Sequence, residues 1–138
     1  GLVPEVEETR YGLHHRAGGI ELICGDAFGL DAELLAGCAA VFDRAALIAL
    51  PPDMRQRYAR ELYARLPQGC RGLLITLEYP QAERDGPPFS VEQPEVEALY
   101  ADHWRVQLLE QRPIPPGAPG FIDGLSRLDT RVYRLDRR

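Results

Sequence analysis

Several features that mark other classes of protein are absent from this 138-residue sequence. No apolar run reaches the roughly 20 residues of a membrane-spanning helix, and no signal-peptide pattern opens the chain. Basic residues do not dominate, since 16 Lys and Arg face 21 Asp and Glu for a formal net charge of −5. The sequence therefore predicts a cytoplasmic protein that binds neither nucleic acid nor a membrane.

Cysteine is scarce as well. Cys24, Cys38 and Cys70 are odd in number and widely spaced, without Cys-x-x-Cys or nearby histidines. We expect buried, reduced thiols and no metal site. The chain also lacks the Gly-x-x-x-x-Gly-Lys and Gly-x-Ser-x-Gly motifs, which disfavours a nucleotide-using hydrolase or a dehydrogenase.

The residues that are present indicate a single α/β domain over residues 1–138. Hydrophobic residues make up 45% of the chain and charged residues 27%, as in ordinary globular domains. Apolar runs and helical spacings alternate along the sequence. They predict strands over 20–24, 39–42, 72–78, 106–111 and 128–135, and helices over 31–37, 52–66 and from about 90.

Details of these runs predict parts of the sheet. Residues 72–78 are almost continuously apolar, which is typical of a strand covered on both faces in a parallel sheet. The last two strands flank a loop rich in Pro and Gly, so we expect an antiparallel hairpin at one edge. Residues 2–11 are acidic and turn-like and predict a surface connection or a short edge segment.

The adjacent acid and base Asp43 and Arg44 are the first candidates for chemistry. They end the apolar run that begins at Val41, and a second apolar run leads on to Pro51 and Pro52. A surface ion pair is the alternative interpretation. Because charged residues beside a buried strand are costly, we favour a functional role.

An open α/β sheet binds ligands beyond the carboxyl ends of its strands. Three predicted loops lie at such ends, over residues 25–30, 43–52 and 78–89. In the first loop, Asp26 can accept a hydrogen bond from an amino group and Phe28 can cover a flat ring. Equally, Asp26 can cap a turn while Phe28 packs in the core.

These strings resemble the thiopurine S-methyltransferase family in its bacterial form. The resemblance rests on residues 24–30 (CGDAFGL), 42–47 (FDRAAL), 51–53 (PPD), 74–77 (LITL) and 86–91 (GPPFSV), in this order. It implies a partial Rossmann-like class I methyltransferase sheet and S-adenosyl-L-methionine as cofactor. It also implies methyl transfer to a small thiol or chalcogen substrate, such as a thiopurine-like thiol or a selenium or tellurium species, and a link to selenium and tellurium resistance.

The resemblance also implies roles for individual residues. Asp26, Ala27, Phe28 and Asp43 would bind the cofactor, and Asp43 and Arg44 would face the reaction centre. Asp43 would either orient Arg44 or accept a proton through water. Arg44, Pro87, Pro88 and Phe89 would line the acceptor pocket, whereas a second pocket arginine is not evident near residues 113–124.

One departure from the family pattern is large. The family's first two strands, with the glycine loop for the methionine part of the cofactor, have no counterpart here. We therefore expect residues 1–138 to be an amino-terminally truncated domain that is inactive alone. The strand over 39–42 would become an exposed apolar edge, which favours self-association. The alternative is a noncatalytic α/β remnant or interaction module.

Overall fold

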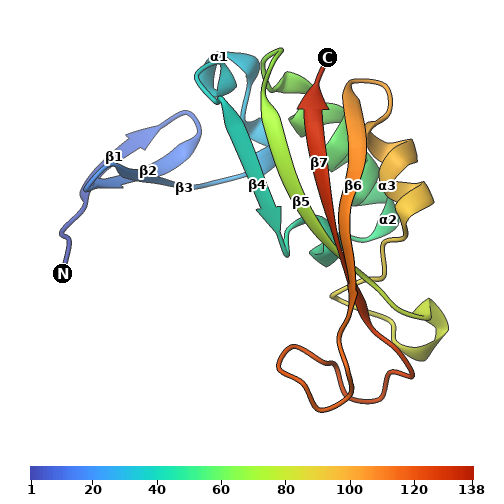
Figure 1. Ribbon diagram of the computed structural model, residues 1–138. Coiled ribbons are helices and arrows are strands. Elements are labelled where there is room, and N and C mark those ends of the chain that lie inside the picture. Colours follow the sequence, from blue (N-terminus) through green and yellow to red (C-terminus); the bar gives the residue numbers. More distant parts are fainter.

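The computed structural model describes all 138 residues, which form two separate sheets with helices beside the larger one (Figure 1). The four-stranded sheet has the order β4-β5-β7-β6, with β4 (Ala40–Arg44), β5 (Arg71–Glu78), β7 (Asp129–Arg137) and β6 (Trp104–Pro113). Only β4 and β5 are parallel, and β7 is antiparallel to both of its neighbours. The predicted α/β class and the antiparallel hairpin with an edge strand are confirmed.

Helices cover one face of this sheet. The segment after β4 begins as α2 (Pro52–Arg57), with proline in the first turn, and continues through η3 (Tyr58–Leu62) to η4 (Tyr63–Arg65). Together with α3 (Gln93–Tyr100) it lies behind the strands in Figure 1. None of the helices has the length and apolar character needed to cross a bilayer.

The core lies between these helices and the sheet. Its fully buried members come from every layer, so removing them from water is the main source of stability. They include Leu47, Tyr63, Leu74, Val96, Tyr100, Trp104 and Leu135.

The opposite face of the sheet is bare, so the expectation that both faces of β5 are covered is wrong for this chain. Along β5, Gly72, Leu74 and Thr76 are buried, but Leu73 between them is 38% exposed. This alternation is typical of a strand with one covered face.

The predicted strand over residues 20–24 exists as β3 (Ile20–Cys24), but it lies outside the main sheet. It pairs with β2 (Gly12–Ala17), which pairs in turn with β1 (Glu5–Thr9), in a three-stranded antiparallel sheet. This small sheet stands to one side of the molecule in Figure 1. Residues 2–11, expected to be a connection or an edge segment, thus include a regular edge strand.

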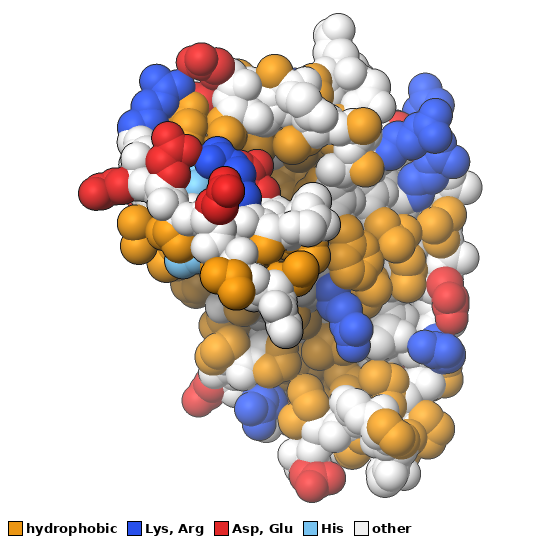
Figure 2. Space-filling model, turned by 90° about the vertical axis from the view of Figure 1, so that its left-hand side faces the viewer, with side chains coloured by type: hydrophobic (Ala, Val, Ile, Leu, Met, Phe, Trp, Pro, Cys, Tyr) orange, Lys and Arg blue, Asp and Glu red, His pale blue; other side chains and the backbone are white.

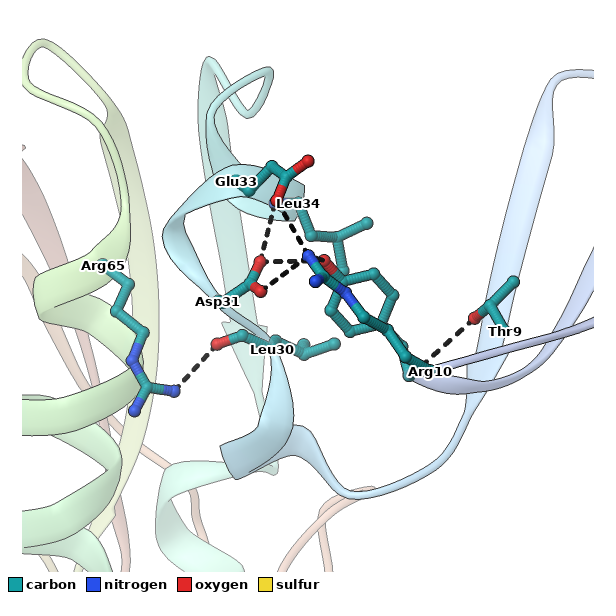
Figure 3. Close-up of polar contacts among 8 residues, drawn as sticks. Thr9, Arg10, Leu30, Asp31, Glu33, Leu34 and Arg65 are labelled. Atoms are coloured by element: carbon teal, nitrogen blue, oxygen red, sulfur yellow. Dashed lines mark hydrogen bonds and ion pairs between the residues drawn. The ribbon is translucent and has the colours of Figure 1, made fainter.

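A polar junction joins the small sheet to the start of α1 (Ala32–Leu35), as Figure 3 shows. Arg10 in the β1–β2 turn forms ion pairs with Asp31 at 3.0 Å and Glu33 at 2.8 Å. The Tyr11 hydroxyl donates to Asp31 at 2.9 Å. Asp31 is also the predicted N-cap, accepting from the Leu34 backbone N–H at 3.0 Å.

All three cysteines are free, but they are not all buried. Cys24 on β3 is exposed, Cys38 is half-buried and Cys70 is buried. The expectation of buried thiols is therefore correct for Cys70 alone. Cys24 is exposed because β3 lies apart from the main core, whereas Cys38 packs at the border of that core.

Candidate functional site

A cleft of about 760 Å³ opens at the carboxyl ends of β4 and β5, on the bare face of the sheet. Two of the three predicted ligand loops line it, through residues 44–49 and 87–88, whereas residues 25–30 do not. The backbone N–H of Phe89 donates to the Ile48 carbonyl at 2.7 Å and joins these two loops. The lining is Arg44, Ala45, Ile48, Ala49, Ile75, Thr76, Leu77, Pro87, Pro88, Glu110, Arg112, Ile114, Gly120, Thr130 and Val132.

Arg44 is exposed on the last position of β4 and lines this cleft. Buried Arg55, by comparison, pairs with Glu95 at 2.9 Å. Arg44 makes no side-chain hydrogen bond or ion pair with the rest of the protein. Its guanidinium is therefore free to bind an anionic or electron-rich ligand.

Asp43 lies on the opposite, helix-covered face of β4, because successive side chains of a strand alternate. It is 2% exposed. Its Oδ2 atom accepts hydrogen bonds from the hydroxyls of Tyr58 at 2.8 Å and Tyr63 at 3.0 Å. Its Oδ1 atom accepts from the Leu47 backbone N–H at 3.3 Å. The structure therefore places Asp43 in the core and does not bring its carboxylate against Arg44.

Burial is the main cause of the raised pKa values of the tyrosines around Asp43. Burial, followed by the nearby Asp43 carboxylate, raises the pKa of Tyr58. Burial together with neighbouring Tyr100 and Asp43 raises the pKa of Tyr63. Both hydroxyls thus stay protonated near neutral pH and act as donors to Asp43.

The first predicted loop forms a separate feature beside β3. Asp26 is exposed and caps η1 (Ala27–Gly29), accepting from the Phe28 backbone N–H at 2.9 Å. The half-buried Phe28 ring lies 4.4 Å from the guanidinium carbon of Arg57. The turn-capping alternative for Asp26 is observed, and Phe28 packs against a helix residue rather than within the main core.

The structure brings only part of the predicted acceptor pocket together. Pro87 and Pro88 line the cleft with Arg44. Phe89 lies outside it, in a second hollow that also includes Arg55, whose guanidinium carbon is 5.5 Å from the Phe89 ring centroid.

The cleft contains a second arginine that the sequence motifs do not predict. Arg112 lines the same cleft, and its nearest carboxylate, Glu110, is 3.8 Å away. A bulge between Leu108 and Glu110 turns both side chains toward Val132 and Thr130 on the cleft side of β7. The only signal in the sequence is that Arg112 directly precedes the Pro-rich loop.

The sheet order, the parallel pair and the cleft at the strand ends define a methyltransferase-type α/β domain. A solved SAM-dependent methyltransferase from Anabaena variabilis superposes with a TM-score of 0.53 at 15% identity. The match covers 82% of this chain and 56% of that one, and it shows a shared fold.

Sequence comparison gives the family. Residues 1–138 match the model of the thiopurine S-methyltransferase family. The chain is 56% identical to a protein named thiopurine S-methyltransferase from Bordetella parapertussis and 59% identical to one from Xanthomonas campestris pv. campestris. Each match covers 99% of this chain and 63% of the relative's length. The chain belongs to the thiopurine S-methyltransferase family.

Proposed function

We propose that the cleft beside Arg44 is the acceptor site of an S-adenosylmethionine-dependent S-methyltransferase. The observation that carries this proposal is an arginine without a protein partner in a cleft with a largely apolar lining. A guanidinium in such surroundings binds a thiolate, a selenolate or an electron-rich heterocycle through its charge and its planar donors. Arg112 lies in the same lining beside Glu110, which is 3.8 Å away and offsets part of its charge.

The residues at the end of β3 fit the adenine part of the cofactor. The exposed Asp26 carboxylate can accept from an amino group, and the Phe28 ring beside it offers an apolar surface. S-adenosylmethionine supplies a methyl group bound to a sulfonium sulfur. The sequence offers no glycine loop for the methionine part, so we propose that residues 1–138 alone bind the cofactor weakly and are inactive.

The position of Asp43 bears on the choice of acceptor. Because Asp43 is buried on the other face of β4, it cannot act as a general base in the cleft. Glu110 is the one carboxylate in the lining, and it lies 3.8 Å from Arg112. Nucleophiles that ionise near neutral pH need no strong base and fit these surroundings. We propose that the acceptor is a small thiol, such as a thiopurine-like thiol, or a selenium or tellurium species, and that methylation of these elements confers resistance to them. Three cysteines without a disulfide support a cytoplasmic location.

This proposal is tested by measuring methyl transfer with the full-length product of the gene. Acceptors would be a panel of aromatic thiols and chalcogen oxyanions. We expect Arg44→Ala to lower kcat/KM for the acceptor by about 100-fold, because charge stabilisation at the reacting centre is lost. Cofactor affinity should change less than about twofold. Arg105→Ala, which removes an exposed arginine of β6 outside the cleft, is the control. Unchanged turnover of several acceptors by Arg44→Ala would contradict the assignment.

The open edge of the main sheet supports a second proposal, self-association of this chain. β4 pairs only with β5, so the backbone groups along its other side have no strand partner. Phe42 on this strand is 65% exposed. Unpaired apolar edges favour pairing with another chain. The same edge supports the alternative of a noncatalytic interaction module, and the methyl-transfer assay separates the two functions.

A further inference from the structure

A tight turn carries the chain from β4 into the helical layer, next to the cleft. Ala45 has φ of 73°, and it is the only residue other than glycine with a positive φ. The left-handed region costs an L-residue roughly 1–2 kcal/mol. A turn of this kind keeps its conformation only where the surrounding structure constrains it.

Two constraints act on this turn. On its far side, η2 (Leu47–Ala49) is fixed by burial, since Leu47 is fully buried and Ile48 is 7% exposed. On its near side, the Asp43 carboxylate accepts from the Leu47 backbone N–H and closes the turn. Arg44 lies between these two points, and no side-chain bond of its own fixes its direction. The backbone of Arg44 is thus held on one side by the pairing of β4 with β5, where Arg44 lies opposite Ile75, and on the other side by this turn. Together they set the direction in which Arg44 enters the cleft.

The Asp43 carboxylate is itself held by two tyrosines from the following helix. Tyr58 and Tyr63 both donate to Oδ2, and neither residue lines the cleft. A buried carboxylate that loses a donor must find another partner or change its position.

We propose that Tyr58 and Tyr63 are positioning residues for Arg44. Their hydroxyls fix the Asp43 carboxylate in the core, and Asp43 in turn fixes the turn that directs Arg44 into the acceptor cleft. The inference rests on the proposed function of the cleft. It deepens that function by assigning a role to two residues that touch neither substrate nor cofactor.

The structure supplies a matched control. Tyr100 is 1% exposed and its ring centroid lies 5.0 Å from that of Tyr63, but its hydroxyl donates no hydrogen bond to Asp43. Tyr100→Phe thus removes a buried hydroxyl from the same cluster while leaving every hydrogen bond to the Asp43 carboxylate in place. Tyr58→Phe and Tyr63→Phe remove hydroxyls of equal size that do hold Asp43.

The test is the affinity of the chain for 5-thio-2-nitrobenzoate, an anionic aromatic thiol, measured by calorimetric titration. We expect Arg44→Ala to weaken binding about tenfold, and Tyr58→Phe and Tyr63→Phe to weaken it about three- to tenfold. Tyr100→Phe should stay within about twofold. In the Arg44→Ala background, Tyr58→Phe and Tyr63→Phe should have no further effect, because they act through Arg44. Circular dichroism and thermal unfolding of each variant report whether the fold is retained.

The outcomes are separable. If the Tyr58 and Tyr63 variants behave like Tyr100→Phe, or weaken binding equally with and without Arg44, their role is only structural and the inference is overturned. If Arg44→Ala itself leaves the affinity unchanged, the proposed acceptor site fails. An intact Arg44 effect with silent tyrosines overturns the positioning inference alone.

Discussion

Asp43 and Arg44 are neighbours in the sequence but belong to different parts of the molecule. Asp43 lies in the tyrosine-lined core and Arg44 lies in the cleft. The two-residue period of a strand separates them onto opposite faces. Asp43 therefore has a structural role in the core, Arg44 is a candidate for ligand binding, and the two do not form an ion pair.

Ala45 offers a test of the turn between them. Relief of its positive φ is worth roughly 1–2 kcal/mol, and added glycine entropy in the unfolded chain costs about 0.4–1 kcal/mol. We therefore expect Ala45→Gly to raise the free energy of unfolding by about 0.5–1 kcal/mol in urea titrations. Ala46→Gly is the control. Ala46 has φ of −77°, so glycine there should lower the same quantity by about 0.5–1 kcal/mol. A destabilised Ala45→Gly would show that Ala45 is not strained.

Among the elements, the segment after β3 is held against the helical layer by one arginine. Arg65 in η4 donates to the carbonyl oxygens of Phe28 at 2.7 Å and Leu30 at 2.8 Å. Figure 3 shows its side chain reaching across from the helix to Leu30. This contact ties the proposed adenine-binding loop to the main helical layer.

We expect Arg65→Ala to destabilise this segment locally by about 1–3 kcal/mol, because charge-assisted hydrogen bonds are lost. The measurement is hydrogen exchange of the Gly29 and Leu30 amides, which donate to the Asp26 and Ala27 carbonyls. Faster exchange should be confined to this loop. Arg60→Ala, an exposed arginine of the same helical stretch, should leave it unchanged. Equal exchange in both variants would show that Arg65 does not hold the loop.

The β6–β7 hairpin shows how a single inserted residue changes an element's role. Before the bulge, Val106 and Leu108 pair with Leu135 and Tyr133 on the core side. After it, Glu110 and Arg112 line the cleft. Without the bulge, the two-residue period would direct all four side chains to one face.

On the scale of the whole molecule, the most prominent feature is the face of the main sheet that no helix covers. Figure 2 views the molecule from the side of the small sheet, and hydrophobic side chains spread over much of the surface there between groups of charged ones. Phe42, Leu73 and Leu109 are 65%, 38% and 51% exposed. Exposed apolar side chains next to an unpaired edge favour contact with another chain.

Phe42→Lys tests the proposed self-association. A charge on the β4 edge opposes strand pairing, so we expect the variant to remain monomeric where the parent chain associates. Sedimentation velocity over a concentration series measures this. Leu22→Lys, at a position 64% exposed on the small sheet, is the control and should associate like the parent. A monomeric parent chain, or equal effects of both variants, would contradict pairing through β4.

Much of this protein can be predicted from the sequence because its signals are local. Apolar runs give β4, β5 and β7, and Asp31 and Pro52 mark helix starts through capping and a fixed φ. The loop motifs indicate the family, to which the chain belongs. The loops at the ends of β4 and β5 follow from the same strand signals, and Arg44, Pro87 and Pro88 on them line one cleft.

The rest was decided by tertiary structure. The pairing of β3 with β2, the bare face of β5, the burial of Asp43 and the entry of Arg112 into the cleft all depend on contacts between distant residues. A sequence reports which side chains share a strand face, but not which face another element covers. Burial and strand partners are set by the packing of the whole chain, because the same apolar pattern gains free energy from any surface that excludes water.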